Sequence, residues 1–184
     1  MSNIVIITAP SAAGKTTLIK KYMANHPNSL FSVSYTTRES RPNEIDGKDY
    51  YFISKEKFKE MIENEDFIEW AFVHDNYYGT SFKELEKADN DEENILILDI
   101  DIQGALYLKN KGIDAKYIFI TVSSIDDLKK RLEIRGTESE ENIKTRIWNA
   151  KRELEYKSEF DIIIENDDID KAYNELEKAI NLKV

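Results

Sequence analysis

The sequence predicts an α/β fold in which a mostly parallel sheet is covered on both faces by helices. Short runs of apolar, β-branched residues alternate with stretches of helical periodicity through most of the 184 residues, and this alternation is typical of parallel sheets. A loop rich in small residues follows the first apolar run, at residues 9–16. The segment from about Phe31 to Asn90 breaks the alternation with closely spaced strands that are polar on one side. That segment is predicted to be an inserted antiparallel lobe.

The elements of the core follow from local pattern. Residues 3–8 are a short apolar run and predict a buried strand, and residues 16–26 carry apolar side chains at helical spacing. Residues 94–100 hold four consecutive apolar residues before Asp99 and predict the clearest buried strand. Further strands are predicted at 116–123 and 160–166, and further helices at 103–112, 124–135, 141–159 and 168–182.

The inserted segment has shorter and more polar elements. A polar connection over residues 37–50 contains proline and an Asp-Gly pair, both typical of turns. The aromatic-rich stretch 67–81 reads as strand and is predicted to end at a turn around Gly79. The predicted elements of the segment are strands at 30–36, 50–53 and 67–81, and a helix at 54–65 with Ser54 as its N-cap.

Composition limits the classes of function. The net charge is −10, which argues against nucleic acid as a partner, because unspecific binding to it relies on basic patches. No apolar run is long enough to span a membrane. The apolar stretch near the N-terminus is too short for the hydrophobic region of a signal peptide. With no cysteine in the sequence, a disulfide framework is excluded. The expected location is the cytoplasm, and the sequence leaves monomer and homodimer both open.

The loop after the first strand matches the general phosphate-binding pattern G-x-x-x-x-G-K-[ST] at all but its first glycine. Backbone N–H groups and the start of the following helix would converge on phosphates. Lys15 would add a charge at the β- and γ-phosphates, and Thr16 would offer its hydroxyl to Mg²⁺. The residues expected to bind ATP here are Ala9, Pro10, Ser11, Ala12, Ala13, Gly14, Lys15, Thr16 and Thr17.

Two positions of this loop that often hold glycine are Ala9 and Ala12. Alanine keeps the backbone N–H donor, so the phosphate contact survives the exchange. If either residue must adopt a positive φ angle, the strain costs on the order of 1–2 kcal/mol. Gly14, next to the lysine, is retained.

Asp99 ends the apolar run of the clearest predicted strand. An aspartate at this place resembles a Walker B residue, which would hold Mg²⁺ across from Thr16. Because many parallel strands end in aspartate, the assignment depends on the loop. Together, Thr16 and Asp99 form the predicted metal site, with Mg²⁺ arriving as the partner of ATP.

Several blocks of the sequence, in order, resemble the guanylate kinase family. They are SVSYTTRESRPNEIDGKDYYFIS, FIEWAFVHDNYYGTS, ILDIDIQGA and RLEIRGTESEENIKTRI. With the loop, they span nearly the whole chain, from Ile4 to about Asp168. The resemblance implies a three-layer αβα core, an inserted GMP-binding lobe and a helical lid. It also implies transfer of a phosphoryl group from ATP to GMP, and to dGMP beside it, which gives ADP and GDP.

The resemblance implies a GMP site in the inserted lobe. Arg38 and Arg41, with neighbouring hydroxyl groups, are suited to clamp an anion. Glu69 would read guanine, because a carboxylate accepts hydrogen bonds from both N1–H and N2–H₂. From the residues alone, Glu69 could equally be a solvent-facing strand residue. The implied GMP-binding residues are Ser34, Arg38, Arg41, Tyr50, Glu69, Tyr78, Gly79, Thr80 and Asp101.

The resemblance also implies a lid in the stretch RGTESEENIKTR. Arg135 and Arg146 match its arginines, which would close over the ATP phosphates and neutralise charge during transfer, and Arg135 is thereby an implied ATP-binding residue. On the bare sequence both could also be ordinary surface arginines. Asn166 matches a position near the adenine of ATP. The implied catalytic residues are Lys15, Arg38, Arg135 and Arg146.

Two other classes of function stay open. Guanylate-kinase-like domains also serve as protein-binding modules without catalysis, and a related P-loop kinase could act on another phosphorylated small molecule. The chain is predicted to be a single guanylate-kinase-like domain over residues 1–184. Its predicted parts are a core at 1–32, 92–134 and 158–184, a GMP-binding lobe at 33–91 and a lid at 135–157.

Overall fold

The structure is a computed structural model that describes residues 3–73, 75–87, 94–135 and 139–182. Its core is a five-stranded sheet in which every neighbouring pair is parallel, in the order β2-β7-β1-β8-β9. The strands of this sheet are β1 (Ile4–Thr8), β2 (Leu30–Ser32), β7 (Leu96–Asp99), β8 (Lys116–Thr121) and β9 (Ile162–Glu165). The predicted α/β class and its parallel sheet are confirmed.

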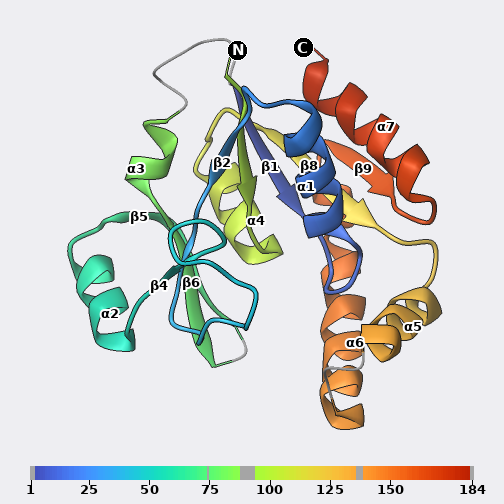
Figure 1. The fold of residues 1–184 in the computed structure, drawn as a ribbon, viewed down its shortest axis with the longest axis horizontal. Coiled ribbons are helices and arrows are strands. Elements are labelled where there is room, and N and C mark those ends of the chain that lie inside the picture. The colour runs from blue at the N-terminus through green and yellow to red at the C-terminus, as the bar shows by residue number, and fades with distance from the viewer. Residues whose placement is uncertain (1–2, 74, 88–93, 136–138, 183–184) are drawn as a thin grey trace.

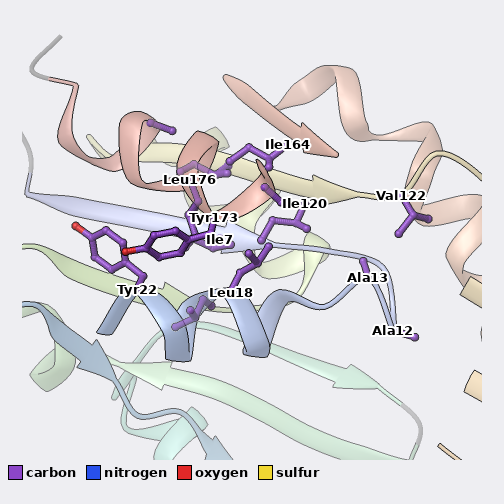
Figure 2. Packing of buried hydrophobic residues seen from close by; sticks show 14 of the residues in the cluster. Ile7, Ala12, Ala13, Leu18, Tyr22, Ile120, Val122, Ile164, Tyr173 and Leu176 are labelled. Atoms are coloured by element: carbon purple, nitrogen blue, oxygen red, sulfur yellow. The ribbon is translucent and has the colours of Figure 1, made fainter. Parts of the chain in front are cut away.

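Helices cover both faces of this sheet (Figure 1). Alternate residues of β1 explain why: Val5 and Ile7 enter one buried cluster, whereas Ile6 enters another. Figure 2 shows Leu18 and Tyr22 of the first helix packed on the side of Ile7. The helices are α1 (Lys15–Asn25), α4 (Ile102–Asn110), α5 (Ile125–Arg135), α6 (Glu140–Glu155) and α7 (Ile169–Asn181), with a 3₁₀ turn at Lys157–Glu159 after α6.

A second sheet of four strands lies in the inserted segment, in the order β4-β3-β6-β5. Pairs β3–β6 and β5–β6 are antiparallel, as expected for the lobe, and β3–β4 is parallel. The elements here are β3 (Tyr35–Thr36), β4 (Tyr51–Phe52), α2 (Lys55–Glu63), β5 (Phe67–Val73), β6 (Asn76–Ser81) and α3 (Phe82–Leu85). Ser54 caps α2 by accepting from the Lys57 backbone N–H at 3.1 Å, as predicted.

Two local predictions for the lobe were wrong, and one helix was missed. Residues 30–36 form two strands in two different sheets, because the chain leaves the core ladder after Ser32. The stretch 67–81 is a hairpin, so its turn lies before β6 and not at Gly79. Gly79 sits inside β6, where a Cβ would lie only 3.0 Å from atoms of Phe58 and Phe67. The short helix α3 had no recognised pattern in the sequence.

The arrangement opens a crevice at the carboxyl edge of the core sheet. Ile7, near the end of β1, is in register with Asp99 at the end of β7. Ligands of open parallel sheets bind outside the carboxyl ends of the strands, where the strand order reverses. Among the described residues, no helix is long and apolar enough to cross a membrane.

Candidate functional site: a phosphate loop facing a carboxylate pocket

The loop between β1 and α1 has the tight geometry that phosphate binding needs. The Ala13 N–H donates to the Pro10 carbonyl at 3.1 Å, and Gly14 precedes α1 with a φ angle of 91°. Ala12 adopts a φ angle of 67°, whereas Ala9 is not among the described residues with positive φ. The strain anticipated for an alanine in this loop therefore falls on Ala12 alone.

The loop is held from beneath by side chains far along the sequence. Asn166, which is only 4% exposed, donates its side-chain amide to the Ala13 carbonyl at 2.7 Å. Arg131 donates to the same carbonyl at 3.3 Å and to the Asn166 carbonyl at 2.6 Å. Sequence reasoning missed Arg131. Asn166 is not among the residues that line the cleft. Its hydrogen bond to the Ala13 carbonyl instead helps to fix the loop.

The Lys15 side chain extends from the start of α1 to the carboxyl end of β7. Its ammonium group forms an ion pair with Asp99 and donates to the Ile100 carbonyl at 2.9 Å. Both side chains of the ion pair are less than one-fifth exposed. The lysine is therefore already held at the floor of the site, beside the strand that carries the predicted metal ligand.

The donor set suits a magnesium ion that arrives with a nucleotide. Thr16 and Asp99 line the same cleft, and they offer one hydroxyl and one carboxylate. Mg²⁺ keeps several waters and takes few protein ligands when phosphates complete its shell. No cluster of three or more histidine, cysteine or acidic side chains suited to a metal occurs among the described residues.

The loop and the lobe face each other across one cleft of about 310 Å³. Most of the predicted site residues meet there. From the core side, the cleft is lined by Ala9 to Thr17, Asp99 and Asp101. From the lobe and α6, it is lined by Ser34, Tyr50, Glu69, Tyr78, Gly79 and Arg146.

Glu69 and Asp101 form a carboxylate pair at the lobe side of the cleft. Glu69 is 5% exposed, and burial raises its pKa from 4.5 to about 7, although a hydrogen bond with Thr80 opposes the rise and the Asp101 charge adds to it. Asp101 is the N-cap of α4, where it accepts from the Gly104 N–H at 2.7 Å. Burial likewise raises the pKa of Asp101. Two carboxylates here provide acceptors for a ligand rich in N–H donors.

The two arginines of the polar connection lie outside the residues that line the cleft. Arg38 donates to both oxygens of Glu44, at 2.8 and 2.9 Å, and lies over the Tyr50 ring at 5.5 Å. The Arg41 side chain is 65% exposed and is 3.9 Å from the same carboxylate. Sequence reasoning missed Glu44. The Glu44 carboxylate accepts hydrogen bonds from the Arg38 guanidinium, as the oxygens of a phosphate group could.

Helix α6 contacts the phosphate loop directly. Arg146 donates to the Ser11 hydroxyl at 2.7 Å. Two turns further along, Glu153 faces the same region: burial raises its pKa and Asp101 adds to the rise, while the Ser11 N–H favours the ionised form. Sequence reasoning missed Glu153. Arg135 is the last residue of α5, and its side chain lies outside the described part of the structure.

These features define the class of protein. A strand, a phosphate loop and a helix, with a lysine and an aspartate at the neighbouring strand end, make a P-loop nucleotide-binding site. The second polar pocket in the same cleft leaves room for another polar ligand beside the nucleotide phosphates.

Comparison with known proteins narrows the class. The family model described as guanylate kinase matches residues 1–183, and the chain belongs to the guanylate kinase family. It is 44% identical over 177 residues to the guanylate kinase of Caldanaerobacter subterraneus subsp. tengcongensis, covering 96% of this chain and 85% of the relative. The Schizosaccharomyces pombe guanylate kinase is also 44% identical, with coverages of 94% and 87%.

A solved structure agrees with this placement. The guanylate kinase from Anaplasma phagocytophilum superposes with a TM-score of 0.74 at 30% identity, and covers 96% of this chain and 83% of that one. A shikimate kinase from Bacteroides thetaiotaomicron, at 19% identity and a TM-score of 0.51, shares the fold alone.

Proposed function

We propose that the protein transfers the γ-phosphoryl group of MgATP to GMP, giving ADP and GDP. One observation carries the proposal: the phosphate loop and the Glu69–Asp101 carboxylate pair line the same cleft. A donor nucleotide and a guanine-bearing acceptor can thus meet with their phosphates between the two sites. The guanylate kinase relatives support catalysis over the binding-module alternative.

The acceptor is already an anion, so the reaction needs no strong general base. Catalysis then rests on positioning and on neutralising charge. In our proposal Lys15 contacts the transferring phosphate, while Arg38, Arg146 and Arg135 gather around it. When bound with ATP, Mg²⁺ would supply charge neutralisation at the phosphate oxygens, held from the protein side by Thr16 and Asp99.

The acceptor phosphate is assigned to the lobe. We propose that Arg38 exchanges Glu44 for the GMP phosphate, helped by Arg41 and by hydroxyl groups. The buried Glu69 carboxylate would accept from guanine N1–H and N2–H₂. Adenine presents an acceptor at N1 and would leave that buried carboxylate unpaired. The proposed GMP-binding hydroxyl groups are those of Ser34, Tyr50, Tyr78 and Thr80.

A coupled assay of ADP release with GMP, dGMP, AMP and UMP as acceptors tests the proposal. We expect turnover with GMP and dGMP, and rejection of AMP by a factor on the order of 10⁴. The Lys15→Met variant, prepared in the same way, controls for contaminating kinases. Equal rates with GMP and AMP would remove the role of Glu69 and favour another acceptor. A folded protein inactive with every acceptor would favour a binding module. The cytoplasmic location and the oligomeric state stay predictions.

A further inference from the structure

The chain crosses between the two sheets beside the acceptor pocket. It enters the lobe between β2 and β3, through Val33 and Ser34, which belong to neither strand. It leaves the lobe sheet at the end of β6 and continues directly into α3. In Figure 1, α3 follows β6 where the chain turns back from the lobe toward the core.

A buried carboxylate ties these two crossings together. Glu84 of α3 is only 3% exposed, and its Oε2 atom accepts from the Val33 backbone N–H at 2.7 Å. The same oxygen accepts from the Lys87 ammonium group at 2.6 Å. Burying a carboxylate is costly unless charged or polar partners compensate for the lost water. A hydrogen bond to an ionised acceptor is also stronger than one between neutral groups.

The bond between Glu84 and Val33 lies next to two residues of the proposed GMP site. Ser34 directly follows Val33, and its hydroxyl lies 3.3 Å from the Thr80 hydroxyl on the other crossing. The Ser34 carbonyl accepts from the Tyr51 N–H at 2.9 Å, which fixes its backbone from the lobe side. The two crossings are thus linked twice, once at the pocket and once behind it.

We propose that Glu84 is a positioning residue for the acceptor half of the site: it holds the two crossings together so that Ser34, which lines the cleft, keeps its spacing from the buried Thr80 behind it. This role rests on the proposed function, because it assumes that GMP binds there. Glu84 itself is not among the residues that line the cleft. It acts through the Val33 N–H and through the backbone that leads to Thr80.

Steady-state kinetics of two variants tests the role. Glu84→Leu keeps the volume but leaves the buried Val33 N–H unpaired, and we expect KM for GMP to rise roughly tenfold. KM for ATP should stay within about twofold, because the phosphate loop is held from the core. Glu84→Gln keeps an acceptor for Val33 and should restore most of the affinity for GMP. The exposed Glu86→Gln is the matched control for the same chemical change in the same region, and it should resemble the wild type.

Hydrogen exchange gives a readout that does not depend on GMP. The Val33 amide should exchange faster in Glu84→Leu than in the wild type, and Glu84→Gln should slow it again. If Glu84→Leu does not fold, Glu84→Asp draws the carboxylate back by one methylene at equal charge and should raise KM for GMP by a smaller factor.

Three outcomes would overturn the proposal: an unchanged KM for GMP in the folded variant, an equal rise of both KM values, or no rescue by glutamine. Wild-type turnover with GMP is measured first. Its absence refutes the proposed function, whereas wild-type turnover with an insensitive Glu84 refutes only the positioning role.

Discussion

The phosphate loop and the polar connection that carries Arg38 differ in what holds them. The loop is fixed by side chains of the core, since Asn166 and Arg131 both donate to the Ala13 carbonyl. Arg38 is held by Glu44, six residues along the same connection. One half of the site is therefore shaped before ligand arrives, whereas the other must exchange an internal ion pair for a bound one.

The two halves of the site should therefore differ in how much ligand binding has to rearrange them. A prearranged loop loses little conformational entropy when phosphates bind. In the lobe, the incoming phosphate competes with a carboxylate that already satisfies the guanidinium. We therefore expect substitutions at the loop to change the rate of transfer, and substitutions in the lobe to change the affinity for the acceptor.

The largest effect is expected at the loop. Lys15→Met removes the cation that forms the ion pair with Asp99, and kcat should fall by about 10²–10³-fold, as for loss of one preorganised charge at a transition state. KM for GMP should change little. Single-turnover kinetics at saturating nucleotides measures the step. A variant that keeps kcat but loses affinity for GMP would contradict the division between the two halves.

In the lobe, Arg38→Lys keeps the charge but loses the planar fork. KM for GMP should rise about 10- to 100-fold with a smaller change in kcat, because hydrogen bonds between charged groups are lost. The same change at the exposed Arg41 should have a weaker effect. Titration calorimetry with GMP measures both variants. If Arg41→Lys weakens binding more than Arg38→Lys, then Arg38 is a structural partner of Glu44 and not the main phosphate ligand.

The raised pKa of Glu69 predicts opposite pH trends for the stability of the fold and for the binding of GMP. Its pKa rises from 4.5 in the unfolded chain to about 7 in the fold, so the native state binds more protons across this window. The contribution to the free energy of unfolding should therefore fall as pH rises from about 4.5 to about 7, by on the order of 1 kcal/mol per pH unit. Affinity for GMP should rise over the same window, because binding needs the ionised form.

Denaturation and GMP titrations from pH 5 to pH 8, on the wild type and Glu69→Gln, separate this contribution from those of other carboxylates. The glutamine variant should lose both trends. Parallel pH curves for the two proteins would show that another group titrates.

The smallest effect is expected at Ala12. Its φ angle of 67° strains an alanine by on the order of 1–2 kcal/mol, and glycine removes this strain while adding freedom to the unfolded chain. Ala12→Gly should therefore raise the free energy of unfolding by up to about 1 kcal/mol. Ala9→Gly is the matched control without positive φ and should give no gain. Equal gains for both would assign the effect to something other than backbone strain.

The sequence predicted the core better than the lobe for a physical reason. Strands buried on both faces must be continuous apolar runs, so 94–100 and 116–123 were recognisable, and the phosphate loop has its own local pattern. The run 30–36 alternates smoothly, yet the chain changes sheets between Ser32 and Tyr35, where the Val33 N–H donates to a carboxylate fifty-one residues away. Local pattern carries no trace of such a partner.

The sequence also predicted some parts of the site better than others. Residues that belong to a motif, such as Lys15 and Asp99, were found and lie together. Residues that act on the motif from elsewhere, such as Arg131, Glu44 and Glu153, were missed, because their side-chain types are common on helices and in polar connections. The predicted roles of individual site residues stay predictions until the variants are measured.

The hydrogen bond beneath the phosphate loop links parts of the chain that are 153 residues apart. During synthesis, β1 and its loop are made long before the amide that braces Ala13, because that amide follows β9, the strand that pairs with β8. A partly made chain can thus carry the complete nucleotide-binding motif and still lack the brace that gives the motif its shape. This bracing of the loop therefore has to wait until the residues that follow β9 have been made and have folded.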